Sequence, residues 1–297
     1  MTRAALEIVP FPEAAWQQAL DVIAPGGACA MQQSQSYGAV LGARGRRVAR
    51  FEIRADGVRI GLVQMIGRRG MWLISRGPVF VPDCPMVLQR RALCRLARRP
   101  GLVLATPAAA VAGPGLIPLI TSRHHAIWSL RPDLPALRAG LSGKWRNRLV
   151  AAERAGLRVC PEPEFDWILR ADQAQQRARG YRALPADFTR DWAAQAPDDL
   201  IALRIEDATG ARIAGVIVLR HGAGASYHIG WSGAQGRASG AHNLGLWQAA
   251  SILRARGVVQ FDLGDVDGEA GAGRLHFKLG TGARAVSLGA SLLVLPI

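Results

Sequence analysis

Two lysines, Lys144 and Lys278, are the residues of this chain best suited to a specific chemical role. Of its 37 lysines and arginines, 35 are arginine, so the composition supplies arginine wherever a positive charge alone is needed. A retained lysine therefore indicates a position that needs a compact, rotatable ammonium in place of the broad, planar guanidinium. The alternative for each is a surface lysine retained by chance. The neighbouring residues must distinguish between these two interpretations.

Lys278 lies in the segment GRLHFKLG (273–280), directly after Phe277. We expect it at the end of a strand beside the segment FDLGD (261–265). An ammonium at that place could stabilise a developing oxyanion or bind a phosphate, which makes Lys278 the first catalytic candidate. The alternative is a lysine that caps a strand end at the surface.

Lys144 and Arg148 are four residues apart in a segment with a helical pattern. Residues at this spacing are neighbours on a helix surface, so the two cations form one basic face. Such a face suits phosphate binding. On charge alone, a solvated helix face explains it equally well.

A third candidate site precedes the apolar helix predicted over 243–257. Arg237, Gly240 and His242 nearly match the R-x-x-G-x-G/A loop by which N-acyltransferases hold a pyrophosphate. In such a loop, backbone N–H groups at a helix N-terminus point at the phosphate. His242 stands where a small residue normally lets the phosphate approach, which argues against acyl-CoA. An ordinary glycine-rich turn is the alternative.

Other catalytic patterns are missing from the sequence. It has no G-x-S-x-G, H-E-x-x-H or Walker loop, and no G-x-G-x-x-G after a strand. The acidic residues between 262 and 269 lack EF-hand spacing and favour turn chemistry. The four cysteines form no C-x-x-C pair. We therefore expect no metal site.

The composition favours a basic, folded protein. A hydrophobic content of 49% can fill real cores, and a formal net charge of +15 predicts attraction to a polyanion such as nucleic acid or anionic lipid. The alternative is arginine enrichment without a partner. The first residues lack the apolar run of a signal peptide, so we expect a cytoplasmic protein with reduced thiols.

The uncharged stretch 102–120 has the length of a membrane span. Three prolines and two glycines would interrupt any helix there. We expect a buried strand, a turn and the start of a short helix instead.

The apolar spacing predicts an α/β protein made of two similar units, divided near 132–135. We expect domains at 1–133 and 134–285. The predicted strands are 47–54, 58–66, 71–75, 102–106, 200–207, 211–222, 225–232, 258–265 and 287–297. The predicted helices are 12–23, 85–98, 134–156 with a break near 140–143, 165–195 with a break at 180–185, and 243–257. The second half has the element order of a GNAT-type acyltransferase core, with 233–242 as its glycine loop.

Several segments, taken together and in order, resemble the FemABX family of peptidyltransferases. They are QQSQSYG (32–38), SRGPV (75–79), LSGKWRNRLVAAERAGL (141–157), YHIGWSGAQGRASGAHNLGLWQAA (227–250), FDLGDVD (261–267) and RLHFKLGTGA (274–283). Members of this family transfer amino acids from aminoacyl-tRNA to a peptidoglycan precursor. The resemblance implies two tandem GNAT-like domains, with the chain's end (286–297, including SLLVLPI) returning to the first. It implies no metal and no organic cofactor.

The resemblance also implies roles for individual residues. Phe277 and Lys278 match the family's F-K pair, whose lysine is thought to stabilise the tetrahedral intermediate. Tyr227 lies in a matching substrate segment. A phosphate-binding lysine follows the Q-S-x-x-W/Y-G segment in some members; here that segment ends with Tyr37 and Gly38, and the nearest cation is Arg44. A further phosphate-binding arginine of the family corresponds roughly to Arg177 or Arg179.

Three functions remain open at this point. The first is an aminoacyltransferase that moves an amino acid from aminoacyl-tRNA to an amine acceptor, with transient contact with an anionic membrane surface as a further expectation. The second is an acyl-CoA-dependent N-acyltransferase. The third is a non-catalytic GNAT-like module that binds nucleic acid.

Overall fold

The computed structural model describes residues 4–180, 183–267 and 272–297. The chain forms two compact units. Unit 1 comprises residues 1–125, 221–224 and 286–297, and unit 2 comprises residues 126–220 and 225–285. The sequence places the division at 133–134, whereas the structure places it between His125 and Ala126.

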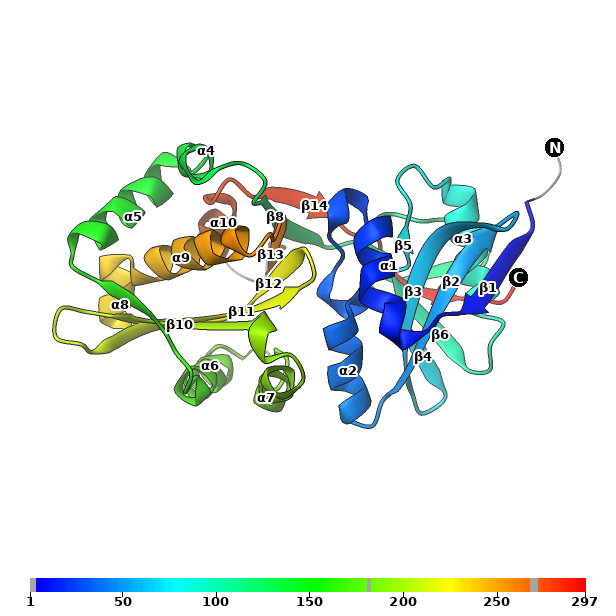
Figure 1. Ribbon diagram of the computed structural model, residues 1–297, viewed down its shortest axis with the longest axis horizontal. Helices are drawn as coiled ribbons and strands as arrows, with labels where there is room; N and C mark the ends of the chain where they lie inside the picture. Colours follow the sequence, from blue (N-terminus) through cyan, green and yellow to red (C-terminus); the bar gives the residue numbers. More distant parts are fainter. Residues whose placement is uncertain (1–3, 181–182, 268–271) are drawn as a thin grey trace. The chain divides into compact units, whose positions relative to one another are not determined.

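Unit 1 is built on a mixed sheet with the strand order β1-β2-β3-β4-β6-β15-β7, in which β5 also pairs with β3 (Figure 1). Its strands are β1 (Leu6–Pro10), β2 (Arg47–Ala55), β3 (Val58–Arg68), β4 (Met71–Ser75), β5 (Val79–Phe80), β6 (Leu102–Thr106), β7 (Leu116–Ile120) and β15 (Ser291–Val294). Its helices are α1 (Trp16–Ile23), α2 (Gln35–Ala43) and α3 (Met86–Leu96). The helix at 85–98, the three-stranded meander and the strand at 102–106 are where the sequence predicts them.

Two cores lie on opposite faces of this sheet. Leu93 and Leu96 of α3 pack with Trp72, Ile74 and Val103 on one face. Helix α1 packs on the other face, where Trp16 and Leu20 contact Leu62 of β3. Since successive strand residues point to opposite faces, both cores draw on the same strands.

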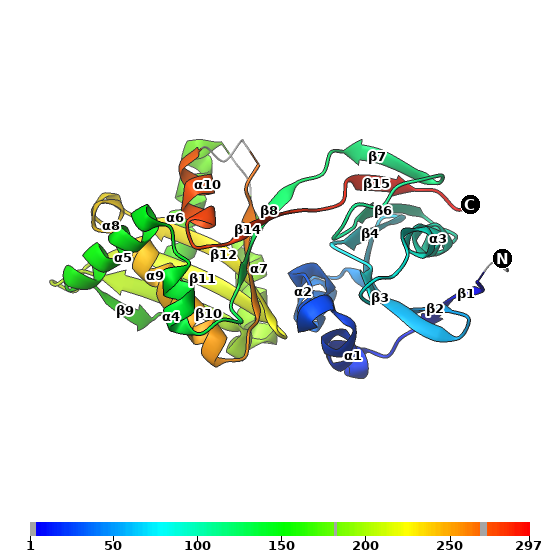
Figure 2. The same ribbon diagram turned by 90° about the horizontal axis from the view of Figure 1, so that it is seen from above.

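The end of the chain inserts into the sheet of unit 1. Strand β15 pairs antiparallel with β6, with Leu292 opposite Ala105, and with β7, with Leu292 opposite Pro118. The expected returning strand is confirmed (Figure 2). The expected start of a helix before residue 120 is wrong. Residues 116–120 form a strand because β15 supplies hydrogen-bond partners from a distant part of the sequence.

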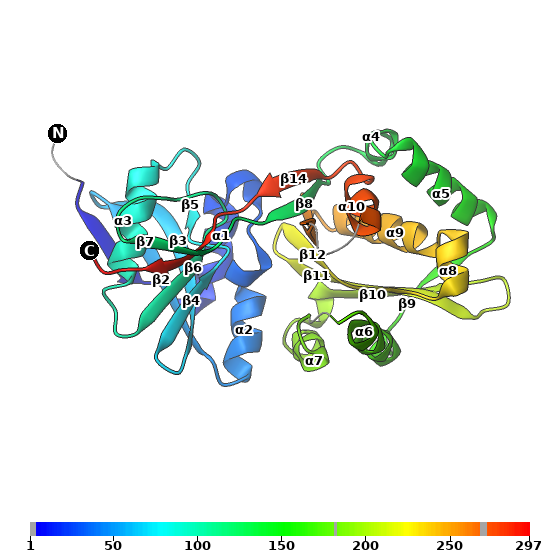
Figure 3. The same cartoon turned by 180° about the vertical axis from the view of Figure 1, so that it is seen from behind.

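Unit 2 is built on a sheet with the order β14-β8-β13-β12-β11-β10-β9. Its strands are β8 (His124–Ser129), β9 (Arg158–Pro161), β10 (Leu200–Glu206), β11 (Arg212–His221), β12 (Gly224–Ser232), β13 (Gln260–Asp265) and β14 (Arg284–Ser287). Its helices are α4 (Leu134–Ala139), α5 (Gly143–Arg154), α6 (Asp166–Arg179), α7 (Ala186–Gln195), α8 (Ala234–Ser239), α9 (Ala241–Ala255) and α10 (Ala272–Leu279). Figure 3 shows α5, α9 and α10 on one face of this sheet and α6 and α7 on the other.

The expected helix breaks have local causes. The Ser142 side chain accepts a hydrogen bond from the Trp145 N–H and caps α5, while Asp133 caps α4 in the same way. Gly156 follows the end of α5 with φ +66°, and Gly180 ends α6 with φ +68°. Both glycines adopt the left-handed conformation in which a helix commonly stops.

Two local expectations are wrong in unit 2. Residues 272–279 form helix α10 instead of a strand, and residues 234–239 form helix α8 instead of an open loop. The helix of 272–279 follows from Leu275 and Leu279, whose i, i+4 spacing places both against the core of the unit.

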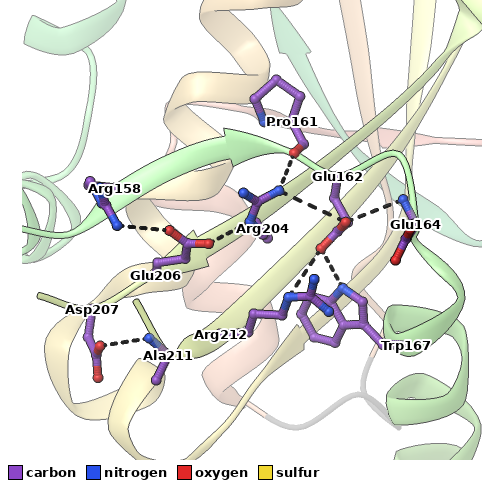
Figure 4. Close-up of polar contacts among 10 residues, drawn as sticks. All are labelled: Arg158, Pro161, Glu162, Glu164, Trp167, Arg204, Glu206, Asp207, Ala211 and Arg212. Carbon is purple, nitrogen blue, oxygen red and sulfur yellow. Dashed lines mark hydrogen bonds and ion pairs between the residues drawn. The ribbon is translucent and has the colours of Figure 1, made fainter. Parts of the chain in front are cut away.

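An ion-pair network fixes the edge of the unit 2 sheet (Figure 4). Glu162 is 3% exposed. It accepts a hydrogen bond from Trp167 Nε1 at 2.7 Å and lies 3.5 Å from Arg212 Nε. Arg204 binds Glu206 at 2.6 Å, and Arg158 also reaches Glu206. The carboxylates and guanidinium groups satisfy one another, so we assign this cluster a structural role.

In the part of the chain that the structure describes, no helix combines the length and the apolar character needed to cross a bilayer.

Candidate functional site

The side-chain ammonium of Lys278 attaches this residue to the end of strand β13. Lys278 lies on α10, half-buried, and Nζ donates a hydrogen bond to the main-chain oxygen of Asp265 at 2.7 Å. Asp265 is the last residue of β13, so the lysine is attached to the end of this strand. The lysine is therefore fixed in position and still has N–H groups to donate.

The surroundings of Lys278 lower its pKa. The largest cause is burial, which disfavours the charged form, and Arg274 acts in the same direction. Asp262 and Asp265 oppose this by attracting the ammonium. An ammonium in such a place is poorly hydrated and interacts strongly with a new negative charge.

Tyr227 and His242 form a hydrogen-bonded pair near the lysine. The Tyr227 hydroxyl on β12 lies 2.8 Å from His242 Nε2 on α9. Burial lowers the pKa of His242 to about 4 and outweighs an opposing effect of the Trp231 backbone. His242 Nδ1 forms no hydrogen bond with any described residue. The imidazole is therefore neutral near pH 7.

Aromatic contacts connect this pair to α10. Between ring centroids, Phe277 lies 5.2 Å from His242 and 6.1 Å from Trp145 of α5. Gly230 leaves the space that the Tyr227–His242 pair occupies. A Cβ at residue 230 would overlap the Tyr227 hydroxyl and come 2.5 Å from the His242 ring. Glycine is required there by close approach, although its backbone is ordinary strand.

Two cavities of unit 2 meet at Phe277. The first measures about 660 Å³, is mostly apolar, and has Lys144, Trp145, Arg148 and His276 in its lining. The second measures about 440 Å³. Its lining includes Lys278, Tyr227, His242, Arg274 and Gln175. Both cavities are also lined by Arg148, Asn243, Gly273 and Phe277.

The R-x-x-G segment does not form an open phosphate loop. Arg237 lies in α8 and donates to the Ser232 carbonyl at 2.6 Å, while its own carbonyl accepts from Arg148 Nη1 at 2.7 Å. Gly240 has φ +74°, and a Cβ there would come 2.9 Å from the Arg148 carbonyl oxygen. Helix α5 therefore packs against the turn that would have to receive a pyrophosphate. The side chain of His242 packs between Tyr227 and Phe277.

The remaining candidates lie on or at the end of helices α2 and α6. Arg177 is an exposed residue of α6 and lines neither cavity, and Arg179 ends the same helix. Tyr37 and Arg44 belong to unit 1, on α2 and at its C-cap. Tyr37 is half-buried, and burial raises the pKa of its phenol.

The acidic residues near Lys278 act as turn formers. The side chain of Asp262 accepts the Gly264 N–H and that of Asp265 accepts the Asp267 N–H, both at 2.7 Å. Glu269 lies outside the described residues. Within 4–180, 183–267 and 272–297, no group of three metal-ligating side chains comes together.

Sequence reasoning missed several residues of the site. Trp145 and Asn243 line the first cavity, Arg274 and Gln175 line the second, and Gly230 shapes the Tyr227 pair. Trp145 carried a signal, because an aromatic beside a lone lysine is typical of nucleotide contacts. Gln175 and Gly230 carried none, since only the folded chain brings them to Lys278.

Together the two units define a tandem GNAT-like fold of the FemABX type. A crystal structure of FemX matches with a TM-score of 0.78 at 13% identity, over 98% of each chain. The structure of L-PGS from Bacillus licheniformis matches with a TM-score of 0.54 at 13% identity, over 97% of this chain and 92% of that one. A tandem GNAT protein from the clavulanic acid biosynthesis pathway matches with a TM-score of 0.52 at 13% identity, over 97% of each.

No sequence-family description matches the chain, and no curated protein matches it by sequence. At these identities the similarity establishes the fold.

Proposed function

We propose that this protein is an aminoacyltransferase that moves an amino acid from aminoacyl-tRNA to the amine of an acceptor and forms an amide. The observation that carries the proposal is the placement of Lys278, a half-buried ammonium anchored to a strand-end carbonyl in the second cavity. It occurs in a fold that is similar to FemX over its whole length.

The chemistry needs little from the protein, since an aminoacyl ester is already activated. The acceptor amine attacks the ester carbonyl, the C–N bond forms, and the carbonyl oxygen becomes an oxyanion. Lys278 stabilises that charge with an N–H that Asp265 does not use. The intermediate then collapses, and the bond to the ribose oxygen breaks. That oxygen takes a proton as it leaves.

The Tyr227–His242 pair offers a route for the proton of the attacking amine. A neutral His242 with its proton on Nδ1 accepts a hydrogen bond from the Tyr227 hydroxyl, whose oxygen then faces the second cavity as an acceptor. The amine gives its proton to Tyr227 while Tyr227 passes its own to His242 Nε2. The same two transfers in reverse then deliver this proton to the leaving ribose oxygen, so the pair ends in its starting state. No covalent enzyme intermediate is needed.

The first cavity suits the end of the tRNA donor. Trp145 and Phe277 offer aromatic surfaces for a base, and Lys144 and Arg148 offer cations for phosphates. The net charge of +15 favours a polyanionic partner of this kind. The acceptor would approach Lys278 through the second cavity.

Acyl-CoA is the second candidate donor, and the R-x-x-G spacing of Arg237 and Gly240 is the observation that favours it. The packing of α5 against Gly240 and the inward His242 side chain oppose it.

The test supplies the pure protein with charged bulk tRNA, and separately with a panel of acyl-CoAs, in the presence of an amine-rich extract. Mass spectrometry follows the transferred group. We expect acceptor-dependent discharge of aminoacyl-tRNA. With Lys278→Ala, turnover falls by about 10²–10³-fold, while the tRNA dissociation constant stays within about threefold. Arg154→Ala, which removes an exposed cation elsewhere in unit 2, serves as the control.

Three other outcomes contradict the proposal. Turnover of an acyl-CoA in place of charged tRNA supports the second donor. Binding of aminoacyl-tRNA without transfer of its amino acid to any acceptor supports a non-catalytic module. An unchanged rate in Lys278→Ala removes the lysine from the mechanism.

A further inference from the structure

One row of aliphatic side chains crosses four neighbouring strands of unit 1 and remains partly or fully exposed. Leu73 of β4 lies opposite Leu104 of β6, which lies opposite Leu293 of β15, which lies opposite Ile117 of β7. Residues that are paired across strands point to the same face, so the four side chains are contiguous.

Further aliphatic side chains lie on the same face, two residues from each member of this row. Met71 lies opposite Leu102, and these two side chains are 45% and 59% exposed. Leu295 follows Leu293 toward the Leu102 end and is 37% exposed, whereas Leu119 follows Ile117 toward the opposite end of the strands and is 55% exposed. We call these eight residues together the aliphatic face. The four strands are shown side by side in Figure 2.

The aliphatic face lacks the cover that the rest of the sheet has. Helix α3 packs on the opposite face of these strands, over Trp72, Ile74 and Val103. Helices α1 and α2 lie on the same side as the aliphatic face, but they contact β2, β3 and β5. Strands that are apolar on both faces are normally buried on both. A contiguous exposed patch of this kind marks a binding surface.

Arginines border one end of this face. Arg68 ends β3 and Arg69 lies in the turn that leads to β4, while Arg98 and Arg99 lie in the loop that leads from α3 to β6. Strands β4 and β6 are parallel, and Leu102 N donates to the Gly70 carbonyl at 3.0 Å, so both loops lie at the same end of the face. Arg68, Arg69 and Arg98 are exposed, and none forms an ion pair with a described residue.

The part of the sequence that contributes three of these four strands is strongly basic. Between residues 57 and 132 the sequence has eleven arginines and one acidic residue, Asp83. A second copy of the chain, docked through the same face, would bring the arginines of two molecules together. A nucleic acid would match the charge, but it would gain little from Leu, Ile and Met, because bases stack on aromatic rings.

We propose that this end of the aliphatic face docks on an anionic phospholipid bilayer. Met71 and Leu102 enter the boundary between headgroups and acyl chains, and Arg68, Arg69 and Arg98 contact the lipid phosphates. Aliphatic side chains supply burial, and each arginine near the surface adds electrostatic attraction. This docking does not depend on the reaction that unit 2 catalyses.

The test measures flotation of the full chain with vesicles of phosphatidylcholine alone and with vesicles that also contain 30% (about one third) phosphatidylglycerol. We expect binding to the second kind only, weakened by salt. Leu102→Asp and Arg68→Glu should each reduce the partition coefficient roughly five- to tenfold or more. Leu102→Ser, a milder change, should give a smaller loss in the same direction, and a circular dichroism melt confirms that each variant folds.

Matched controls separate docking from general charge. Val58→Asp changes another exposed aliphatic residue of unit 1, and Arg154→Glu makes the same charge change in unit 2. Both should bind vesicles as the parent does. The proposal is overturned if the controls lose as much binding as the test variants, or if no vesicle binds. It is also overturned if Leu102→Asp abolishes a concentration-dependent dimer or tRNA binding without changing vesicle binding.

Discussion

The ammonium of Lys278 donates a hydrogen bond to the main-chain oxygen of Asp265 at 2.7 Å, thirteen residues earlier in the chain. The carboxylates of Asp262 and Asp265 raise the pKa of this lysine, and its burial lowers it by more. The position of the lysine and its protonation therefore depend on the same strand end.

The first prediction concerns the alkaline limb of the pH–rate profile, the range in which the transfer rate falls as pH rises. Lys278 acts in its protonated form, and its pKa lies below the usual 10.5, so the rate should fall as pH rises through that lowered pKa. Asp262→Asn removes a carboxylate that favours the ammonium, so the limb should move to lower pH. Asp198→Asn, which changes an exposed carboxylate of unit 2, should leave it in place. A limb that moves upward in Asp262→Asn would contradict this assignment.

A second prediction concerns Tyr227. Tyr227→Phe removes the hydroxyl that lies 2.8 Å from His242 Nε2, so it should lower kcat by about 10²-fold, as expected for the loss of a proton-transfer group, with little change in KM. Steady-state kinetics at saturating acceptor measures it. A normal kcat would show that the substrate itself, or water, takes the proton.

A third prediction uses two glycines that line the same cavity. Gly230→Ala forces a Cβ into the space of the Tyr227 hydroxyl and should reduce activity strongly. Gly273→Ala, in α10, meets no atom within 4 Å and should keep parental activity and gain slightly in helix stability. Equal activity of the two variants would show that the Tyr227 pair is not needed in its present geometry.

A fourth prediction concerns stability in mild acid. Burial lowers the pKa of both His228 and His242 from 6.5 to about 4, so the unfolded chain binds their protons first as pH falls. The free energy of unfolding should be constant above about pH 6.5 and should fall between pH 6.5 and 4, by roughly 1–3 kcal/mol for each histidine. Urea titrations at pH 7.5, 5.5 and 4.5 (about one unit or more apart) measure the slope.

His228→Gln should remove about half of that slope. His124→Gln, which changes an exposed histidine of unit 1, should remove none. Equal slopes in all three proteins would mean that other groups cause the loss of stability in acid.

A fifth prediction tests the returning strand. Leu292 is 2% exposed in β15, between β6 and β7, so Leu292→Ala should lower the free energy of unfolding by about 2–5 kcal/mol. Leu295→Ala, on the exposed side of the same end of the chain, should cost less than about 1 kcal/mol. Comparable losses would show that Leu295 is covered in solution.

The sequence determined much of this protein by local means. The meander at 47–75, the helices at 85–98 and 243–257 and the helix breaks near 140–143 and 180 follow from periodicity, capping residues and glycines, and the resemblance added the returning end of the chain. The two lysines could be found from composition alone. The tandem fold was predicted because several segments, in order, resemble the FemABX family, and no single motif was sufficient for this prediction.

Only the tertiary structure decided the rest. Residues 116–120 are a strand because β15 pairs with them across more than 170 residues of sequence, and no local pattern encodes a partner so distant. Residues 272–279 are a helix because Leu275 and Leu279 find the core of unit 2. The contact of Tyr227 with His242, the packing of α5 on Gly240 and the open aliphatic face all depend on which surfaces the folded chain brings together.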